Sequence, residues 1–276
     1  MIELGKFNTL EILRDTSVGL FLGDKESNEI LLPNKYVPAT YEIGGEITVF
    51  CYLDHAERPV ATTLEPLIMV NEFQLLQVAE VNEFGAFMDW GLEKHLLVPF
   101  REQRTKMKEG NWYVVYCYLD QQTNRLVASN KLDKFLSNDS LTVSEGEEVE
   151  LVITRLTDLG WEVIINDLHK GLVYFNEIFK EIAVGDNTKG VVKKIRLDNK
   201  VDISLQPLGT NVLEPAANKI YQTLMANGGF LGLHDKSNPK DIQEELQMSK
   251  KTFKKGIGTL YRERRIKIGS DGIYSI

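Results

Sequence analysis

An internal repeat constrains the fold of this 276-residue chain more than any other feature of its sequence. Three similar segments align around Gly19, Gly85 and Gly160, so the repeated unit recurs after 66 and then 75 residues. Later segments repeat in the same order, and each begins at a basic residue. These residues are Arg58, Arg125 and Lys200. Self-similarity of this kind predicts three copies of one small domain in residues 1–208.

The second copy reads as five short strands separated by Gly, Asn and charged turns. The expected strands are Leu75–Ala79, Gly85–Gly91, Leu96–Phe100, Trp112–Asp120 and Arg125–Ser129. Five such strands fit a small closed barrel of the OB type, because closure removes unpaired sheet edges. Side chains alternate along a strand, so inward packing of Met88 and Trp90 leaves Phe87 on the outer wall.

An aromatic side chain on the outside of a barrel needs a reason. A loop or a neighbouring domain can cover Phe87, or the ring can contact a ligand. The sequence leaves both interpretations open.

The motif around this aromatic residue resembles the S1 RNA-binding domain. The resemblance rests on the turn Phe84-Gly85-Ala86-Phe87, on Gly110 before the fourth strand, and on the last two strands. The S1 family has a five-stranded OB barrel whose RNA face uses two aromatics, a His on the third strand, an Asp and an Arg. The resemblance assigns RNA contact to Phe84, Phe87, Asp120 and Arg125. Pro99 stands at the His position.

The other two copies keep only part of this set. In the first copy Phe21 holds the second aromatic position, with Asp54 and Arg58 as the acidic and basic residues, while Val18 and Pro33 replace the rest. Stacking on one aromatic contributes only about 1–3 kcal/mol per base, so we expect this copy chiefly to pack. The third copy has Tyr174 at the His position and Lys200 at the basic position.

Basic pairs precede the third strand in two copies, Lys94-His95 and His169-Lys170. They are either solvated loop charges or phosphate contacts. We include Lys94, His95 and Lys170 among the candidate RNA-binding residues.

Cys51 and Cys117 occupy equivalent positions in near-identical strings. Each is therefore expected to fill its own barrel wall, and the third copy is expected to carry Ile195 there. Two cysteines fit a reducing compartment and do not form a metal site alone. No apolar run is long enough for a membrane span and no secretion signal is visible, so we expect a cytoplasmic protein without membrane contact.

Charge is distributed unevenly along the chain, whose net charge is −8. Residues 209–276 hold 11 Lys and Arg against 7 Asp and Glu, a balance of +4; residues 1–208 hold 21 against 33, a balance of −12. Lys and Arg supply most of the affinity of nonspecific nucleic-acid binding. Any RNA contact of the acidic part must therefore be local and rely on stacking.

The last 68 residues follow a different pattern. Helical periodicity begins at Glu214-Pro215, at Asn238-Pro239 and at Ser249, and a hairpin pattern follows over residues 266–276. Three helices and a hairpin resemble a winged-helix domain. That family places its third helix against nucleic acid, which implies backbone contacts from Lys251, Lys254, Lys255, Arg262, Arg264 and Arg265. A solvated helix face and a protein-docking surface remain alternatives.

Catalytic motifs are absent from the sequence. The four histidines are scattered without Cys or carboxylate partners at metal-ligand spacing, and no nucleophile elbow, Walker loop or dinucleotide fingerprint occurs. The sequence predicts a protein that is not an enzyme and has no catalytic residues, cofactor or metal.

The order of domains resembles that of the bacterial conserved virulence factor B family. It predicts a multidomain, mainly β protein with three tandem S1-like OB-fold barrels and an α+β winged-helix domain. The expected domains are residues 1–65, 66–136, 137–208 and 209–276. The resemblance implies an RNA-binding post-transcriptional regulator whose partner is single-stranded RNA. The alternatives are a scaffold in which acidic barrels dock a basic protein, and a DNA-binding regulator led by the winged helix.

Overall fold

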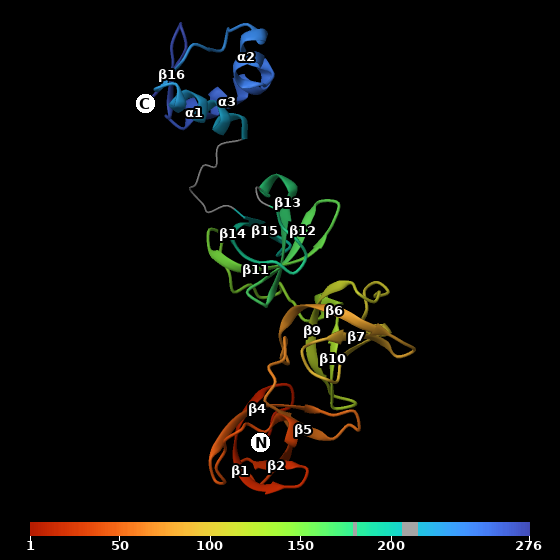
Figure 1. The fold of residues 1–276 in the computed structure, drawn as a ribbon. Helices are drawn as coiled ribbons and strands as arrows, with labels where there is room; N and C mark the ends of the chain where they lie inside the picture. The colour runs from red at the N-terminus through yellow and green to blue at the C-terminus, as the bar shows by residue number, and fades with distance from the viewer. Residues whose placement is uncertain (179–180, 206–214) are drawn as a thin grey trace. The chain divides into compact units, whose positions relative to one another are not determined.

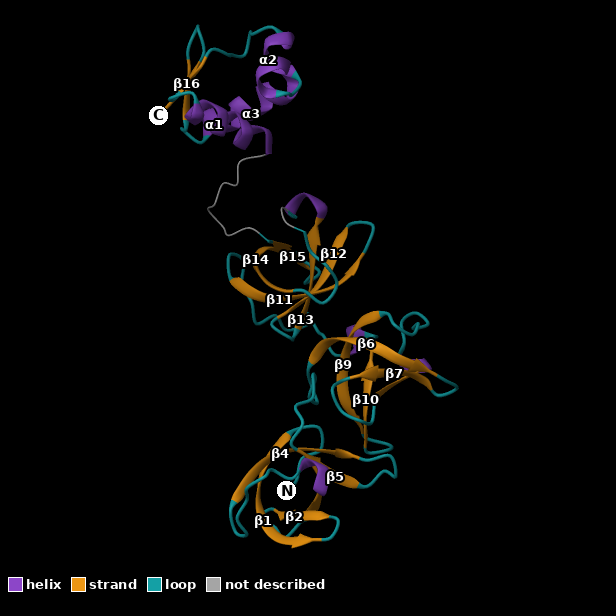
Figure 2. Cartoon of the chain, viewed as in Figure 1, coloured by secondary structure: helices purple, strands orange, loops and turns teal. Residues whose placement is uncertain are grey.

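The computed structural model describes residues 1–178, 181–205 and 215–276 (Figure 1). The chain divides into two compact units, Met1–Pro207 and Leu208–Ile276. Among its described residues, the first unit contains three closed barrels, and the second combines helices with a small sheet (Figure 2). The protein is therefore multidomain and mainly β, as predicted. The expected boundary between residues 208 and 209, and the expected helix start at Glu214, lie outside the described residues.

The three barrels share one strand order. The first barrel contains β1 (Phe7–Thr16), β2 (Gly19–Gly23), β3 (Glu29–Pro33), β4 (Glu46–Leu53) and β5 (Pro59–Thr62). The second contains β6 (Phe73–Val81), β7 (Gly85–Asp89), β8 (Leu96–Pro99), β9 (Trp112–Asp120) and β10 (Arg125–Ser129). The third contains β11 (Glu148–Leu156), β12 (Gly160–Ile165), β13 (His169–Tyr174), β14 (Asn187–Ile195) and β15 (Val201–Ser204). In each, the third strand pairs in parallel with the fifth, and the fourth closes the barrel against the first.

Local details repeat as well. The register shifts in the first strand of every barrel, at Ile12/Arg14, Val78/Glu80 and Ile153/Arg155. Such β-bulges increase the local twist and help a sheet close. A single 3₁₀ turn follows the third strand of each barrel: η1 (Asn34–Tyr36), η2 (Phe100–Glu102) and η4 (Phe175–Glu177). A further turn, η3 (Leu132–Lys134), follows β10.

Alternation along β7 is as expected. Met88 and Trp90 are buried, whereas Phe87 points outward and is half-buried. Inward apolar side chains thus fill the barrel and leave the aromatic residue on its wall.

The cysteines confirm the repeat and also reveal one wrong alignment. Cys51 and Cys117 are buried and free, and they pair with alanines on the neighbouring strand. In the third barrel the corresponding position opposite Ile203 is occupied by Val192, which is fully buried. Ile195 lies three residues farther along β14, opposite Val201, and a β-bulge between Val192 and Lys194 accounts for one of these three residues.

Neighbouring barrels of the first unit share hydrophobic clusters. Phe50 and Tyr52 of the first barrel pack in one cluster with Trp90 of the second. Val114 of the second barrel lies in a smaller cluster with Ile164 of the third. Each barrel of the first unit therefore packs against the next through apolar side chains.

The second unit is a winged helix. It contains α1 (Pro215–Ala226), β16 (Phe230–Leu231), α2 (Pro239–Leu246), α3 (Lys250–Arg262), β17 (Ile266–Ile268) and β18 (Ile273–Ser275), and its sheet has the order β16-β18-β17. Asn238 and Ser249 cap α2 and α3 by accepting hydrogen bonds from backbone N–H groups. The predicted inward face of α3, including Phe253 and Leu260, is buried.

Candidate nucleic-acid interface

A pocket of about 260 Å³ on the second barrel gathers most of the residues that the S1 resemblance singles out. Five of the predicted RNA-binding residues line it: Phe84, Phe87, Lys94, His95 and Arg125. The ring of Phe84 is 64% exposed. Two aromatic rings and two cations therefore lie around one opening.

The turn between β6 and β7 places the two rings. Asn82 closes this turn, because its backbone N–H donates to the Gly85 carbonyl and its side-chain oxygen accepts from the Phe84 N–H at 2.9 Å. Phe84 then projects from the turn, and Phe87 follows on the outward side of β7. Short polar side chains such as Asn favour local hydrogen bonds of this kind.

Glu57 of the first barrel reaches into the same pocket. Its Oε1 lies 3.1 Å from Lys94 Nζ, and its Oε2 lies 3.0 Å from Arg125 Nε. Lys94 Nζ also donates to the carbonyl oxygen of Asp54 at 2.7 Å. The β4–β5 turn thus holds both cations of the pocket, an interaction that the sequence analysis missed.

One signal in the sequence pointed to Glu57. The turns before the fifth strand use a left-handed backbone at Glu57, Asn124 and Asn199, with φ of 61°, 54° and 58°. Asn adopts this conformation readily, whereas other non-glycine residues seldom do. The other two copies carry Asn at this position, so Glu57 is the residue that departs from the repeat.

Asp120 does not line the pocket. Its carboxylate accepts hydrogen bonds from Gln122 N–H and Thr123 Oγ1, and it lies 3.6 Å from Arg101. The structure therefore gives Asp120 a turn-forming role and separates it from the other S1-type residues.

The first barrel uses its predicted residues internally. The guanidinium of Arg14 covers the Phe21 ring at 4.3 Å and forms two hydrogen bonds with Glu29. Arg58 donates twice to the Asp54 carboxylate, at 3.0 and 2.7 Å. These contacts agree with the packing role that the sequence predicts for this copy.

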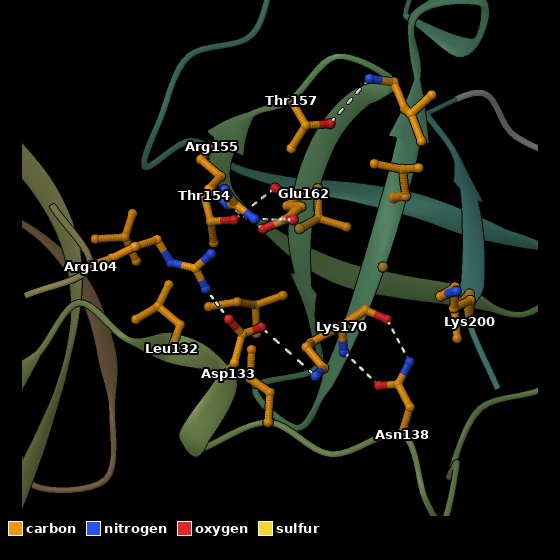
Figure 3. A pocket seen from close by; sticks show the side chains of 18 of the residues that line it. Arg104, Leu132, Asp133, Asn138, Thr154, Arg155, Thr157, Glu162, Lys170 and Lys200 are labelled. Carbon is orange, nitrogen blue, oxygen red and sulfur yellow. Dashed lines mark hydrogen bonds and ion pairs between the residues drawn. The ribbon is translucent and has the colours of Figure 1, made fainter. Parts of the chain in front are cut away.

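The predicted residues of the third barrel line a larger cleft, of about 1330 Å³, between the second and third barrels (Figure 3). Lys170, Tyr174 and Lys200 are among its lining residues. Arg196 lies 5.7 Å from the Tyr174 ring and donates to its hydroxyl. His169 is buried and contacts the Ser137 carbonyl and Thr142, so Lys170 is the accessible member of that pair.

Every basic side chain that lines the cleft has an acidic partner. The pairs are Arg104–Asp133, Lys170–Asp133, Arg155–Glu162, Arg196–Asp202 and Lys200–Asp198. Exposed ion pairs contribute only about 0–1 kcal/mol each, so such partners exchange readily. The cations that line the cleft are therefore neutralised by acidic side chains that exchange readily.

The winged helix holds five of its six predicted contact residues on the surface. Lys251, Lys254, Lys255, Arg262 and Arg264 are exposed. Arg265 is half-buried, and its guanidinium stacks over the Tyr221 ring at 3.9 Å. Arg265 is therefore engaged within the fold.

In residues 1–178, 181–205 and 215–276, no three His, Cys, Asp or Glu side chains gather as a metal site would require. No helix in the same ranges is long and apolar enough to cross a bilayer.

Comparison with known domain families gives two matches. Residues 4–64 match the S1 domain, and residues 218–274 match the CvfB-like winged helix domain. The S1 match falls on the first copy, which keeps only one of the two aromatic positions of the S1 motif, at Phe21. Both families are nucleic-acid-binding or regulatory domains and not enzyme domains.

Whole-chain relatives extend the similarity. The chain is 30% identical over 272 residues to the uncharacterized protein YitL of Bacillus subtilis, covering 95% of this chain and 90% of the relative. It is 27% identical over 236 residues to conserved virulence factor B of Staphylococcus epidermidis, covering 83% and 79%. A crystal structure of a multidomain protein with nucleic acid binding domains from Streptococcus pneumoniae is 25% identical, with coverage of 99% and 98% and a TM-score of 0.42.

Proposed function

This chain belongs to the conserved virulence factor B family, and from that premise we propose that it binds single-stranded RNA and regulates gene expression after transcription. It would act in the bacterial cytoplasm. Unpaired bases stack on the second barrel, and the third barrel and the winged helix add further contacts along the strand.

The observation that carries this proposal is the shared pocket of Phe84, Phe87, Lys94 and Arg125. Base stacking on an aromatic side chain contributes about 1–3 kcal/mol per base and tolerates any sequence. Two rings beside two cations can therefore hold a base and its phosphate together. Duplex bases are stacked inside the helix and cannot reach these rings.

The charge distribution also favours RNA binding through base stacking. The part of the chain before residue 209 has a balance of −12, and Glu57 neutralises the cations nearest the rings. Long-range attraction of phosphate is therefore weak there, and stacking must supply most of the affinity. Tyr174 in the cleft and, on the second unit, the exposed lysines of α3 would provide further RNA contacts.

Fluorescence polarisation tests the proposal on the full-length chain. The probes are a labelled single-stranded RNA and a labelled duplex DNA of equal length, each at two salt concentrations. Phe84→Ala with Phe87→Ala should weaken RNA binding about tenfold or more, because two stacking surfaces are lost. Phe100→Ala is the matched control, since this ring is 44% exposed on the same barrel and lines neither cavity.

The alternative functions give different results. A scaffold for basic proteins would bind neither probe. A DNA-binding regulator would bind the duplex more tightly, and its affinity would be independent of Phe84 and Phe87. Unchanged RNA affinity in the double variant would refute the proposal.

A further inference from the structure

Glu57 of the first barrel bridges the two cations of the pocket on the second barrel. Its Oε1 lies 3.1 Å from Lys94 Nζ and its Oε2 lies 3.0 Å from Arg125 Nε. A phosphate group pairs with Lys and Arg side chains through the same kind of charged contact as a carboxylate does. The carboxylate of Glu57 therefore lies where the phosphate of a nucleotide stacked on Phe84 or Phe87 would meet both cations.

The β4–β5 turn holds this carboxylate in place. The Asp54 carboxylate accepts hydrogen bonds from the N–H groups of Ala56 and Arg58 at 2.8 and 3.0 Å. The Glu57 N–H donates to the Asp54 carbonyl at 3.0 Å, and φ of Glu57 is 61°. Residues other than Gly, Asn and Asp seldom adopt such a φ. The backbone thus takes an unfavourable conformation at the residue whose side chain reaches the second barrel.

The apolar joint between these two barrels also positions Lys94. Trp90 of the second barrel packs edge-on against Phe50 and Tyr52 of the first, with ring centroids 5.8 and 6.4 Å apart. Its indole Nε1 donates to the Lys94 carbonyl oxygen at 2.6 Å. The residue that joins the barrels therefore also holds the backbone of Lys94, whose side chain reaches the turn of the first barrel.

A ligand can nevertheless displace the Glu57 contact. Its Oε2 is buried and, among the residues that the structure describes, accepts no hydrogen bond, although Arg125 Nε is close. A buried acceptor without a hydrogen bond is unfavourable. The side chains of Lys94 and Arg125 are 26% and 51% exposed, so ions in solution reach both. An anion with better-placed oxygens can therefore replace the carboxylate.

We propose that Glu57 occupies the phosphate subsite of the second barrel and that the first barrel thereby inhibits this site, an inference that rests on the function proposed above. A phosphate of the bound strand displaces the carboxylate and takes its place between Lys94 and Arg125. The affinity of the site is lowered, because only the fraction of molecules in which Glu57 has left the cations is competent to bind phosphate there. The first copy, which keeps one S1 aromatic position, acts in this way on the site of the second.

Inorganic phosphate tests the subsite without RNA. In the full-length chain, Glu57→Asn should bind inorganic phosphate about 3- to 30-fold more tightly than the wild-type protein, because two ion pairs no longer have to be broken. Asn suits the left-handed backbone at this position, so the turn should be retained. The NMR signal of the Arg125 Nε–H group, assigned by its disappearance in Arg125→Lys, reports the titration at the site itself.

Two further variants show whether the gain belongs to this contact. Glu93→Gln removes an exposed carboxylate of the second barrel that pairs with Lys35 of the first. It changes the net charge by the same amount and should leave phosphate affinity unchanged, because Glu93 is not among the residues that line the pocket. Glu57→Asn combined with Lys94→Gln should lose most of the gain, because the subsite then holds one cation.

The outcomes separate this inference from the proposed function. Equal phosphate affinity in Glu57→Asn and the wild-type protein overturns the inference, even if RNA binding depends on Phe84 and Phe87. A gain of phosphate binding in a chain that binds no RNA supports the subsite and refutes the RNA function. In the wild-type protein, saturating single-stranded RNA should shift the Arg125 signal toward its position in phosphate-bound Glu57→Asn. An RNA complex that leaves this signal unchanged shows that Glu57 stays in place, which overturns inhibition by the first barrel.

Discussion

Gly85 and Val98 approach so closely across β7 and β8 that a methyl group on Gly85 would lie 2.3 Å from the Val98 carbonyl oxygen. A methyl group on Gly19 or on Gly160 would likewise lie 2.1 Å from a carbonyl oxygen of its own barrel. This close approach explains why glycine marks all three copies. It also sets the start of the strand that carries Phe87.

Gly85→Ala should therefore destabilise the second barrel by about 1–3 kcal/mol, a typical cost of overpacking. Hydrogen exchange of the β7 and β8 amides measures this loss locally, which suits a chain of several domains. Gly110→Ala is the control, because Gly110 has a φ of +78° but no neighbour within 4 Å. Equal losses in the two variants would assign the effect to backbone conformation and not to the contact with Val98.

Glu57→Asn should raise the affinity for single-stranded RNA about 3- to 30-fold, because two ion pairs of up to about 1 kcal/mol each no longer compete with phosphate. The plot of log affinity against log salt should steepen by about 1–2, since two cations become available to phosphates. Asn suits the left-handed backbone at this position, as at Asn124, so the turn should keep its form. Polarisation titrations at several salt concentrations measure both effects.

Two comparisons isolate the Glu57 effect from the change in net charge. Glu42→Gln removes one charge from an exposed loop of the same barrel and should change RNA affinity little. In a background with Lys94→Gln and Arg125→Gln, Glu57→Asn should give no gain, because the cations it frees are gone. If Glu57→Asn still raised RNA affinity in that background, Glu57 would not be competing with phosphate for Lys94 and Arg125.

The cysteines should resist thiol reagents until the barrels unfold. Burial raises the pKa of Cys51 and of Cys117 to about 12, and the thiolate is the reactive form. Each thiol has a higher pKa in the folded than in the unfolded state, so keeping it protonated stabilises the folded state. This contribution to the free energy of unfolding is complete below about pH 9 and is lost as the pH rises toward 12. Titration with Ellman's reagent at pH 8, with and without denaturant, measures the accessibility. Rapid reaction of either thiol without denaturant would contradict the burial.

Repetition and local chemistry made most of the fold predictable from the sequence. The helix caps Asn238 and Ser249 depend on neighbours in the chain, so their positions could be identified directly. Ile195 was assigned wrongly because Asp198 resembles Asp54 and Asp120 in the sequence but lies two residues farther into its turn, and a β-bulge in β14 adds one more residue. The two-residue strand β16 was missed because so short a segment has no periodicity.

The candidate site was predictable only within one barrel. Phe84, Phe87, Lys94 and Arg125 could be grouped because they belong to one copy of the repeat. Glu57 belongs to the preceding copy, and nothing in its spacing shows that its turn reaches the next barrel. Contacts between domains depend on how their surfaces pack, and a repeat pattern does not encode that arrangement.

Lys134→Met should destabilise the second barrel by about 1–3 kcal/mol, because it leaves a buried carboxylate without its partner. Glu102 is 6% exposed, and both of its oxygens accept from Lys134 Nζ at 2.8 Å. Burial raises the pKa of Glu102, but the hydrogen bonds from Lys134 and Ser129, together with the positive charges of Lys134 and Arg101, outweigh it and hold the pKa below its usual value. The contribution of the Lys134–Glu102 pair to the stability of the wild-type protein is therefore present above about pH 4 and is lost as the pH falls below it.

Hydrogen exchange of the β10 amides at pH 7 measures the loss in Lys134→Met, with Lys189→Met as the control. Both partners of the Lys189–Glu148 pair are exposed, so its loss should cost less than about 1 kcal/mol, and equal effects would show that burial of Glu102 is immaterial.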